Sequence, residues 1–217
     1  MAETVGQARS RAHRHQGRHG DGPRRQGPGA RYIRRSLEAS LARLQTDHVD
    51  LYQSHQDDPD TPLTDTLGEY AKLMEAGKVR AIGASNYTAV RLSEALIASE
   101  RHSLPRYESI QPEYNLYRRE PFESGLQSLV KTQQMGTINY YALASGFLSG
   151  KYRSPADAGK SPRGRKIVDT YLNDRGYRIL KALDEVSEEA GCTPAQAALA
   201  WQIAQPGITS PSSRATS

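Results

Sequence analysis

The chain has 217 residues and a formal net charge of +5, a balance that would suit a nucleic-acid partner if the charge were spread over the protein. Residues 1–31, however, hold seven of the 29 basic and two of the 24 acidic side chains, so they carry the whole excess. The rest of the chain is neutral. Binding to nucleic acid through the body of the protein is therefore disfavoured.

Residues 1–30 also lack the side chains that build a core. They contain no Leu, Ile, Phe, Tyr or Trp and are rich in Gly, Arg and His. Such a segment cannot bury enough apolar area to offset the entropy of ordering it, so we expect a disordered basic head. Its composition is also what a G·C-rich coding sequence yields in a shifted frame, which is one hypothesis for its origin. Residues 31–217 are expected to form the folded domain.

The sequence argues against a membrane-spanning, a secreted and a disulfide-rich protein. No run approaches the ~18 apolar residues of a membrane span, and the N-terminus has no apolar stretch of a secretory signal. Cys192 is the only cysteine, so an internal disulfide framework and a cysteine-cluster metal site are both ruled out. We expect a soluble cytoplasmic protein with neither a membrane partner nor a bound metal.

Helices and short strands alternate along the predicted domain. In chain order, the expected elements are helix 31–47, strand 48–53, helix 61–77, strand 78–83, helix 88–99, strand 108–111, helix 121–134, strand 137–141, exposed loop 151–166, helix 170–190, helix 193–204 and strand 207–210.

The spacing of the strands indicates the fold class. Strands that begin near residues 49, 79, 108 and 137 recur every 29 or 30 residues, each followed by a helix. This is the period of a right-handed βα unit, which requires parallel strands covered by helices. No G-x-G-x-x-G follows a strand, which disfavours an open dinucleotide-binding sheet. We therefore predict an α/β fold and favour a (β/α)8 barrel over an open doubly wound sheet.

Polar side chains stand at the end of each of these strands. They are His55, Ser85 with Asn86, Gln111, and Tyr140 with Tyr141. In a (β/α)8 barrel the working groups lie at the carboxyl ends of the strands. Four such ends at the same phase of the repeat favour a shared polar pocket over coincidence.

Four segments carry a resemblance to a known family. They are LQTDHVDLYQSH at 44–55, GKVRAIGASN at 77–86, QPEYN at 111–115, and residues 140–152, which end in GKY. In this order and spacing they resemble the aldo-keto reductase family, particularly its bacterial branch related to potassium-channel β-subunits. The resemblance covers roughly residues 31–211 and implies an NADPH-dependent carbonyl reductase.

The resemblance also implies roles for individual residues. His55 would bind and polarise the carbonyl of a small substrate. Ser85, Asn86 and Gln111 would hold the nicotinamide carboxamide, and the ring of Tyr140 would stack on the nicotinamide.

Further along the chain, the segment from Tyr141 through Leu143 to Ser145, together with Lys151, would face the pyrophosphate and ribose of NADPH. Each assignment has a structural alternative. His55 could be a buried structural histidine, Asn86 could cap the following helix, the tyrosines could pack in the barrel, and Lys151 could be an ordinary loop cation.

Part of the family's active site is not found in this sequence. The resemblance implies an Asp and a Tyr in a motif like D-T-A-x-x-Y-G and a Lys ending a strand like V-x-I-x-T-K, and neither motif occurs. The resemblance therefore implies a partial (β/α)8 barrel of about five parallel strands with helices, in which the first three strands and the final helix are missing. Near the C-terminus, Arg214 stands where the family's 2′-phosphate loop usually has a small residue.

Three functions remain open from the sequence. The first is NADPH-dependent reduction of aldehydes or ketones, impaired by the missing Asp, Tyr and Lys. The second is a non-catalytic module that binds NADPH or a partner. A nucleic-acid binder that works through the head is disfavoured, because the head has no aromatic side chains to stack on bases.

Overall fold

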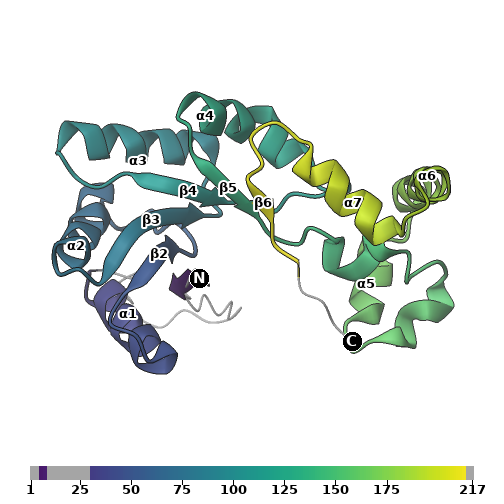
Figure 1. The fold of residues 1–217 in the computed structure, drawn as a ribbon, viewed down its shortest axis with the longest axis horizontal. Coiled ribbons are helices and arrows are strands. Elements are labelled where there is room, and N and C mark those ends of the chain that lie inside the picture. The colour runs from purple at the N-terminus through teal and green to yellow at the C-terminus, as the bar shows by residue number, and fades with distance from the viewer. Residues whose placement is uncertain (1–4, 9–29, 214–217) are drawn as a thin grey trace, which may run out of the picture. The chain divides into compact units, whose positions relative to one another are not determined.

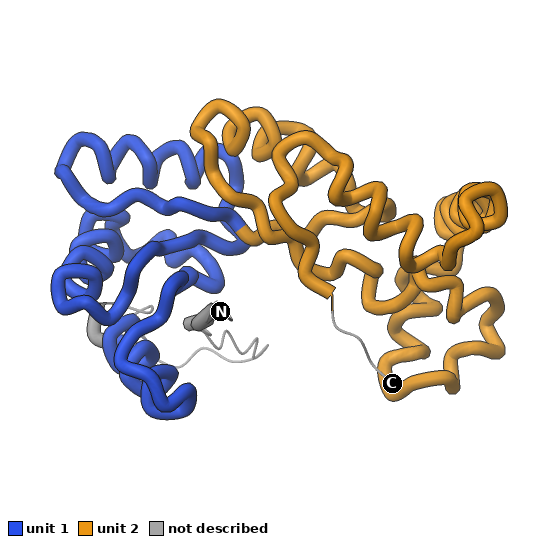
Figure 2. Tube along the Cα trace, viewed as in Figure 1, with its two compact units in different colours: residues 1–110 blue, residues 111–217 orange. Residues whose placement is uncertain are grey.

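The computed structural model describes residues 5–8 and 30–213, and the chain divides into two units, residues 1–110 and 111–217 (Figure 2). Most of the head and Arg214 lie outside the described residues. Parallel strands alternate with helices along the chain, so the predicted α/β class and partial (β/α)8 barrel are confirmed. The units are described separately below.

Unit 1 alternates strands and helices (Figure 1). Its elements are β1 (Val5–Ala8), α1 (Ala30–Leu44), β2 (Val49–Ser54), α2 (Leu63–Glu75), β3 (Val79–Ser85), α3 (Ala89–Arg101) and β4 (Tyr107–Gln111). The strands follow the order β1-β2-β3-β4, with β1, β2 and β3 parallel.

The short strand β1 falls inside the head, where the sequence predicted no structure. It pairs with β2, and Val5 lies opposite Leu51. Its four residues, VGQA, include a single β-branched side chain, which is too weak a signal for a strand prediction.

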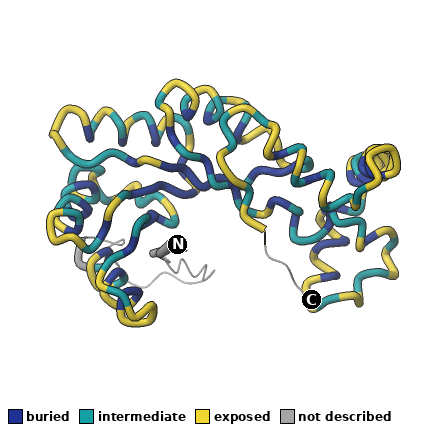
Figure 3. The backbone as a smooth tube through the Cα atoms, in the orientation of Figure 1, coloured by how far each residue is buried: buried dark blue, intermediate teal, exposed yellow. Residues whose placement is uncertain are grey.

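The core of unit 1 forms where α1 and α2 cover the strands. Ile33, Leu37 and Leu41 of α1 are buried, as their helical spacing predicts, whereas Leu44 at the end of the helix is 46% exposed. The hydroxyl of Tyr52 on β2 donates a hydrogen bond of 3.1 Å to the Ile33 carbonyl and ties α1 to the sheet. Each buried aliphatic side chain contributes about 1.5–3 kcal/mol. The last four residues of β3 are all buried (Figure 3).

Unit 2 contains two strands and several helices. Its elements are a π-helical turn (Phe122–Leu126), α4 (Gln127–Thr132), β5 (Gly136–Asn139), two 3-10 turns (Ala144–Ser149 and Pro155–Lys160), α5 (Gly164–Tyr171), α6 (Asp174–Ala190), α7 (Pro194–Ile203) and β6 (Ser210–Pro211). β5 and β6 are parallel, with Ile138 beside Ser210. None of the helices within residues 30–213 is both long and apolar enough to cross a membrane.

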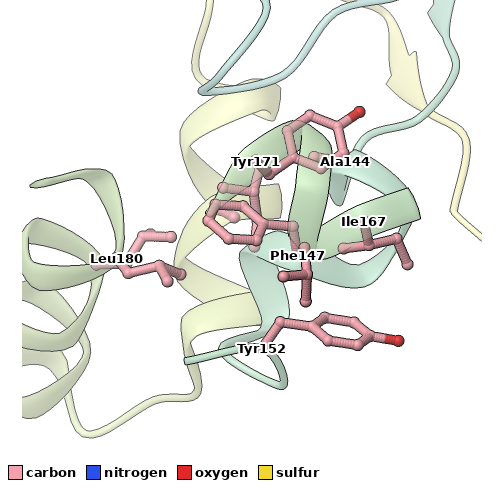
Figure 4. Close-up of a cluster of buried hydrophobic side chains, with 10 residues drawn as sticks. Ala144, Phe147, Tyr152, Ile167, Tyr171 and Leu180 are labelled. Carbon is pink, nitrogen blue, oxygen red and sulfur yellow. The ribbon is translucent and has the colours of Figure 1, made fainter. Parts of the chain in front are cut away.

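The start of α5 differs from the sequence prediction. The helix begins at Gly164, inside the stretch 151–166 that was expected to be an exposed loop. Its Ile167 and Tyr171 are buried in a cluster with Phe147 (Figure 4), and the rings of Phe147 and Tyr171 stack with centroids 5.4 Å apart. The prediction failed because this helix is held by tertiary burial, while its first turn reads as charged loop sequence.

One glycine sets how closely α6 approaches this cluster. A Cβ on Gly176, in the first turn of α6, would overlap the Tyr171 carbonyl oxygen and lie 2.9 Å from Cζ of Phe147. Backbone and ring atoms cannot move aside at low cost, so the close packing of α6 on α5 requires a residue without a side chain.

We therefore expect Gly176→Ala to lower the free energy of unfolding by about 1–3 kcal/mol or more. The matched control is Gly68→Ala in α2, where an added Cβ meets nothing within 4 Å. That substitution is expected to raise stability by about 0.5–1 kcal/mol through helix propensity. Urea unfolding followed by circular dichroism measures both, and equal stabilities of the two variants would contradict the packing argument.

Candidate functional site

Three of the residues singled out by the sequence meet at the ends of β2 and β3. His55 directly follows β2, Ser85 is the last residue of β3, and Asn86 follows it. Nδ2 of Asn86 donates hydrogen bonds to the His55 carbonyl oxygen at 2.8 Å and to Oγ of Ser85 at 3.1 Å. The side-chain amide of Asn86 thus ties together the two strand ends.

The backbone of Asn86 explains why an asparagine suits this point. Its φ is 59°, in the left-handed region that Asn tolerates better than most residues. The sequence alone left open that Asn86 caps the following helix. In the structure Thr88 caps α3, and its side-chain oxygen accepts a hydrogen bond from the Arg91 amide. The Asn86 side chain is therefore engaged with the strand ends and does not cap α3.

The loop that carries His55 is held by an ion pair with α3. Nε of Arg91 lies 3.0 Å from Oδ2 of Asp57, and both side chains are largely buried. His55 itself is half-buried, and its Nδ1 is buried with no hydrogen-bond partner among the residues that the structure describes. Most buried polar side-chain atoms in proteins do have such a partner.

A buried hydroxyl network, which sequence reasoning missed, lies next to His55 in the chain. Oγ of Ser54 contacts the hydroxyls of Tyr70 at 2.8 Å and Tyr107 at 3.1 Å, and the Tyr107 hydroxyl lies 3.3 Å from that of Tyr87. Burial raises the pKa of Tyr70 and Tyr107 well above the ordinary range. Tyr70 lies in the helix that the sequence predicts at 61–77, but no local signal indicates that these hydroxyls converge.

The second group of residues follows β5 in unit 2. The Tyr140 amide donates to the Pro112 carbonyl at 2.9 Å, and Tyr140 forms a parallel bridge with Glu113. Its ring is half-buried and meets the ring of Tyr141 edge-on, with centroids 5.1 Å apart. Tyr141 is 49% exposed, so the alternative that it simply packs in a core does not hold.

The segment 141–146, which comes next in the chain, contains several residues with left-handed backbone conformation. Tyr141, Ala144 and Ser145 have φ values of 54°, 48° and 59°, and Gly146 has 95°. Left-handed geometry costs a residue with a side chain roughly 1–2 kcal/mol, so such a run persists only where surrounding contacts impose it. Strained segments of this kind cluster at ligand-binding sites. Leu143 and Ser145 of this run are both half-buried.

The two remaining predicted site residues are Gln111 and Lys151. Gln111 is the last residue of β4 and is buried, with 8% exposure. Lys151 is exposed, and its ammonium lies 5.8 Å from the ring centroid of Tyr152. The adjoining Gly150 (φ 78°) leaves space for the guanidinium of Arg153, which donates to the Gly150 carbonyl and pairs with Asp184.

The sequence of this chain is similar to those of known proteins. The family model for the Aldo/keto reductase family matches residues 12–217, a match that begins inside the head. L-glyceraldehyde 3-phosphate reductase of Escherichia coli (strain K12) is 30% identical over 194 residues, which are 87% of this chain and 56% of that protein. Protein tas of the same strain is 34% identical over 200 residues, 82% of this chain and 56% of that protein.

A third relative comes from rice. The probable voltage-gated potassium channel subunit beta of Oryza sativa subsp. japonica is 32% identical over 195 residues, 88% of this chain and 60% of that protein. The chain thus spans less than two thirds of the length of these relatives. The family model matches residues 12–217, which are nearly the whole length of this chain. The chain therefore belongs to the aldo/keto reductase family.

The hydroxyl network of unit 1 leads to a pH prediction. An unfolded tyrosine ionises near pH 10, whereas burial keeps Tyr70 and Tyr107 protonated to higher pH in the folded unit. The unfolded state therefore loses protons first, and the free energy of unfolding falls as pH rises above about 10. Each such tyrosine adds up to about 1.4 kcal/mol per pH unit to this slope.

Replacing Tyr70 by Phe is expected to reduce the alkaline slope, while removing one hydroxyl contact to Ser54 costs about 1 kcal/mol at neutral pH. Urea unfolding at a series of alkaline pH values, followed by circular dichroism, measures both effects. A spectrophotometric titration in which all the tyrosines ionise near pH 10, with the fold intact, would refute the burial argument.

Proposed function

We propose that the protein is an NADPH-dependent oxidoreductase that reduces aldehydes or ketones to alcohols. The single observation that carries the proposal is the Asn86 amide, which joins the ends of β2 and β3 and so fixes His55 beside Ser85. Membership of the aldo/keto reductase family supports it, as does the name of the reductase from E. coli.

The chemistry of the residues fits the cofactor. Ser85, Asn86 and Gln111 offer the hydroxyl and amide groups that a carboxamide requires, and Tyr140 offers a half-buried flat ring. The exposed cation of Lys151 suits a diphosphate. When bound, NADPH supplies the hydride for reduction of a carbonyl carbon.

The chain's own residues then bind and orient the reactants. The imidazole of His55 would donate a hydrogen bond to the carbonyl oxygen of a small substrate and polarise it. Asn86 holds the backbone carbonyl of His55, which restrains the point from which the imidazole extends. Since the sequence has no D-T-A-x-x-Y-G motif, we propose turnover slowed by about 10²–10⁴-fold relative to an enzyme with a positioned acid.

A second candidate is a module that binds NADPH without turnover. The similarity to the rice protein named as a potassium channel subunit beta favours it, together with the absence of the acid motif from the sequence. The two candidates share the cofactor contacts and differ only in whether a carbonyl compound is reduced.

One experiment separates these candidates. The full chain is mixed with NADPH, the dissociation constant is measured by fluorescence, and turnover of an aromatic aldehyde is followed by NADPH absorbance. We expect binding and slow turnover. Binding without turnover would favour the module, and a lack of binding would refute both candidates.

Variants assign the roles. His55→Ala is expected to lower kcat/KM by about tenfold or more while the dissociation constant of NADPH stays within about twofold, because the residue acts on substrate. Asn86→Ala is expected to weaken NADPH binding by about tenfold, the value of one hydrogen bond. His102→Ala, in an exposed residue that ends α3, is the control. Equal activities of the His55 and His102 variants would remove His55 from the proposed mechanism.

A further inference from the structure

The segment 140–142 is held through its carbonyl groups, one after another. The Tyr140 carbonyl accepts from the Tyr114 amide at 3.4 Å. The Tyr141 carbonyl accepts from Nδ2 of Asn115 at 3.0 Å, and the Ala142 carbonyl accepts from Nε2 of Gln202 at 2.8 Å. Two of these three donors are side-chain amides from distant parts of the chain. The hydrogen bonds that fix the segment therefore depend on tertiary structure.

Gln202 lies in the last turn of α7 and is fully buried, at a position where an apolar residue would be expected. Its Nε2 donates to the carbonyls of Ala142 and Ala198, and its Oε1 accepts from Nδ2 of Asn139 at 2.7 Å. Both donor hydrogens and the acceptor are thus used. A buried amide is favourable only when its groups are satisfied, and here the satisfied geometry fixes where the Ala142 carbonyl must lie.

Asn115 supports the adjoining carbonyl in a similar way. It is fully buried, and its Oδ1 accepts from the amides of Tyr117 and Arg118, each at 2.9 Å. These two bonds fix the orientation of the side chain, which leaves Nδ2 directed at the Tyr141 carbonyl. Asn115 therefore anchors the segment to its own turn, and Gln202 anchors it to α7.

The segment needs such anchors because its backbone is strained. Tyr141, Ala144 and Ser145 all have left-handed φ values, and none of them is a glycine. A chain free to relax would leave this conformation, so each anchoring hydrogen bond opposes relaxation. The same segment contains Tyr140, which the proposed function assigns to NADPH. It also contains Tyr141, Leu143 and Ser145, which the sequence resemblance places at the pyrophosphate and ribose of NADPH.

We propose that Gln202 and Asn115 are positioning residues, which hold the segment 140–146 in the conformation that binds NADPH. This inference rests on the proposed function. Neither side chain is assigned a contact with the cofactor or the substrate. They act by fixing the carbonyls of Ala142 and Tyr141, and through them the ring of Tyr140.

The first test variant is Gln202→Met, which keeps the length of the side chain and removes its amide. The matched control is Gln205→Met, just beyond the same helix, where Nε2 donates to the Trp201 carbonyl and to no other group among the described residues. The full-length variants are compared by amide hydrogen exchange with mass spectrometry and by the fluorescence titration with NADPH.

For Gln202→Met we expect exchange in the segment 140–146 to become about tenfold faster and the dissociation constant of NADPH to rise about tenfold, the value of one hydrogen bond. Exchange in α1 and β2 should be unchanged, and Gln205→Met should match the original protein. If Gln202→Met fails to fold, Asn115→Asp replaces it, because that variant keeps both acceptor bonds of Oδ1 and puts an acceptor oxygen in place of the donor to Tyr141.

The outcomes separate the two claims. Unchanged exchange in 140–146, or the same change in the Gln205 variant, would overturn the positioning role. Faster local exchange with unaltered NADPH affinity would overturn the link between the segment and the cofactor. If the original protein does not bind NADPH, the proposed function fails along with that link, and hydrogen exchange still decides whether Gln202 holds the segment.

Discussion

The pairing of β2 with β3 is the interaction on which unit 1 depends. The two strands stay in parallel register from Val49 beside Val79 to Ser54 beside Ala84, so they end at the same level. The residues that follow each strand are therefore neighbours, although they are about 30 positions apart in the chain. The amide of Asn86 spans this junction, and the hydroxyl network around Ser54 secures it from the side of the helices.

Unit 2 reaches a defined geometry by another route. Its β5 and β6 share only a short ladder, and the chain after β5 leaves regular structure at once. Side-chain amides take over the role that strand pairing has in unit 1. Asn139 joins the Tyr114 carbonyl to Gln202, and Gln202 in turn joins α7 to Ala142. A buried hydrogen-bonded network of this kind favours one conformation, because each donor amide must keep its partners.

Local signals in the sequence predicted much of this fold. The spacing of strands gave the class, and Thr88 and Thr193 cap α3 and α7, the second through a capping box. Features that depend on distant partners could not be predicted. The early start of α5 depends on burial against Phe147, and the role of Gln202 depends on a carbonyl 60 residues away. The candidate site divides in the same way: the residue types at the strand ends were visible, whereas the bond from Asn86 to His55 was not.

Asn86 also shows how narrowly one position can be constrained. Glycine would adopt the φ of 59° with ease, but it has no amide with which to reach the His55 carbonyl. Glutamine has the amide, but its longer stem would carry that group past the strand ends, and it is less suited to left-handed backbone. Aspartate fits the backbone and offers only acceptors, which would face the oxygen of a carbonyl. The twofold demand of backbone and donor thus favours asparagine over glycine, glutamine and aspartate at this position.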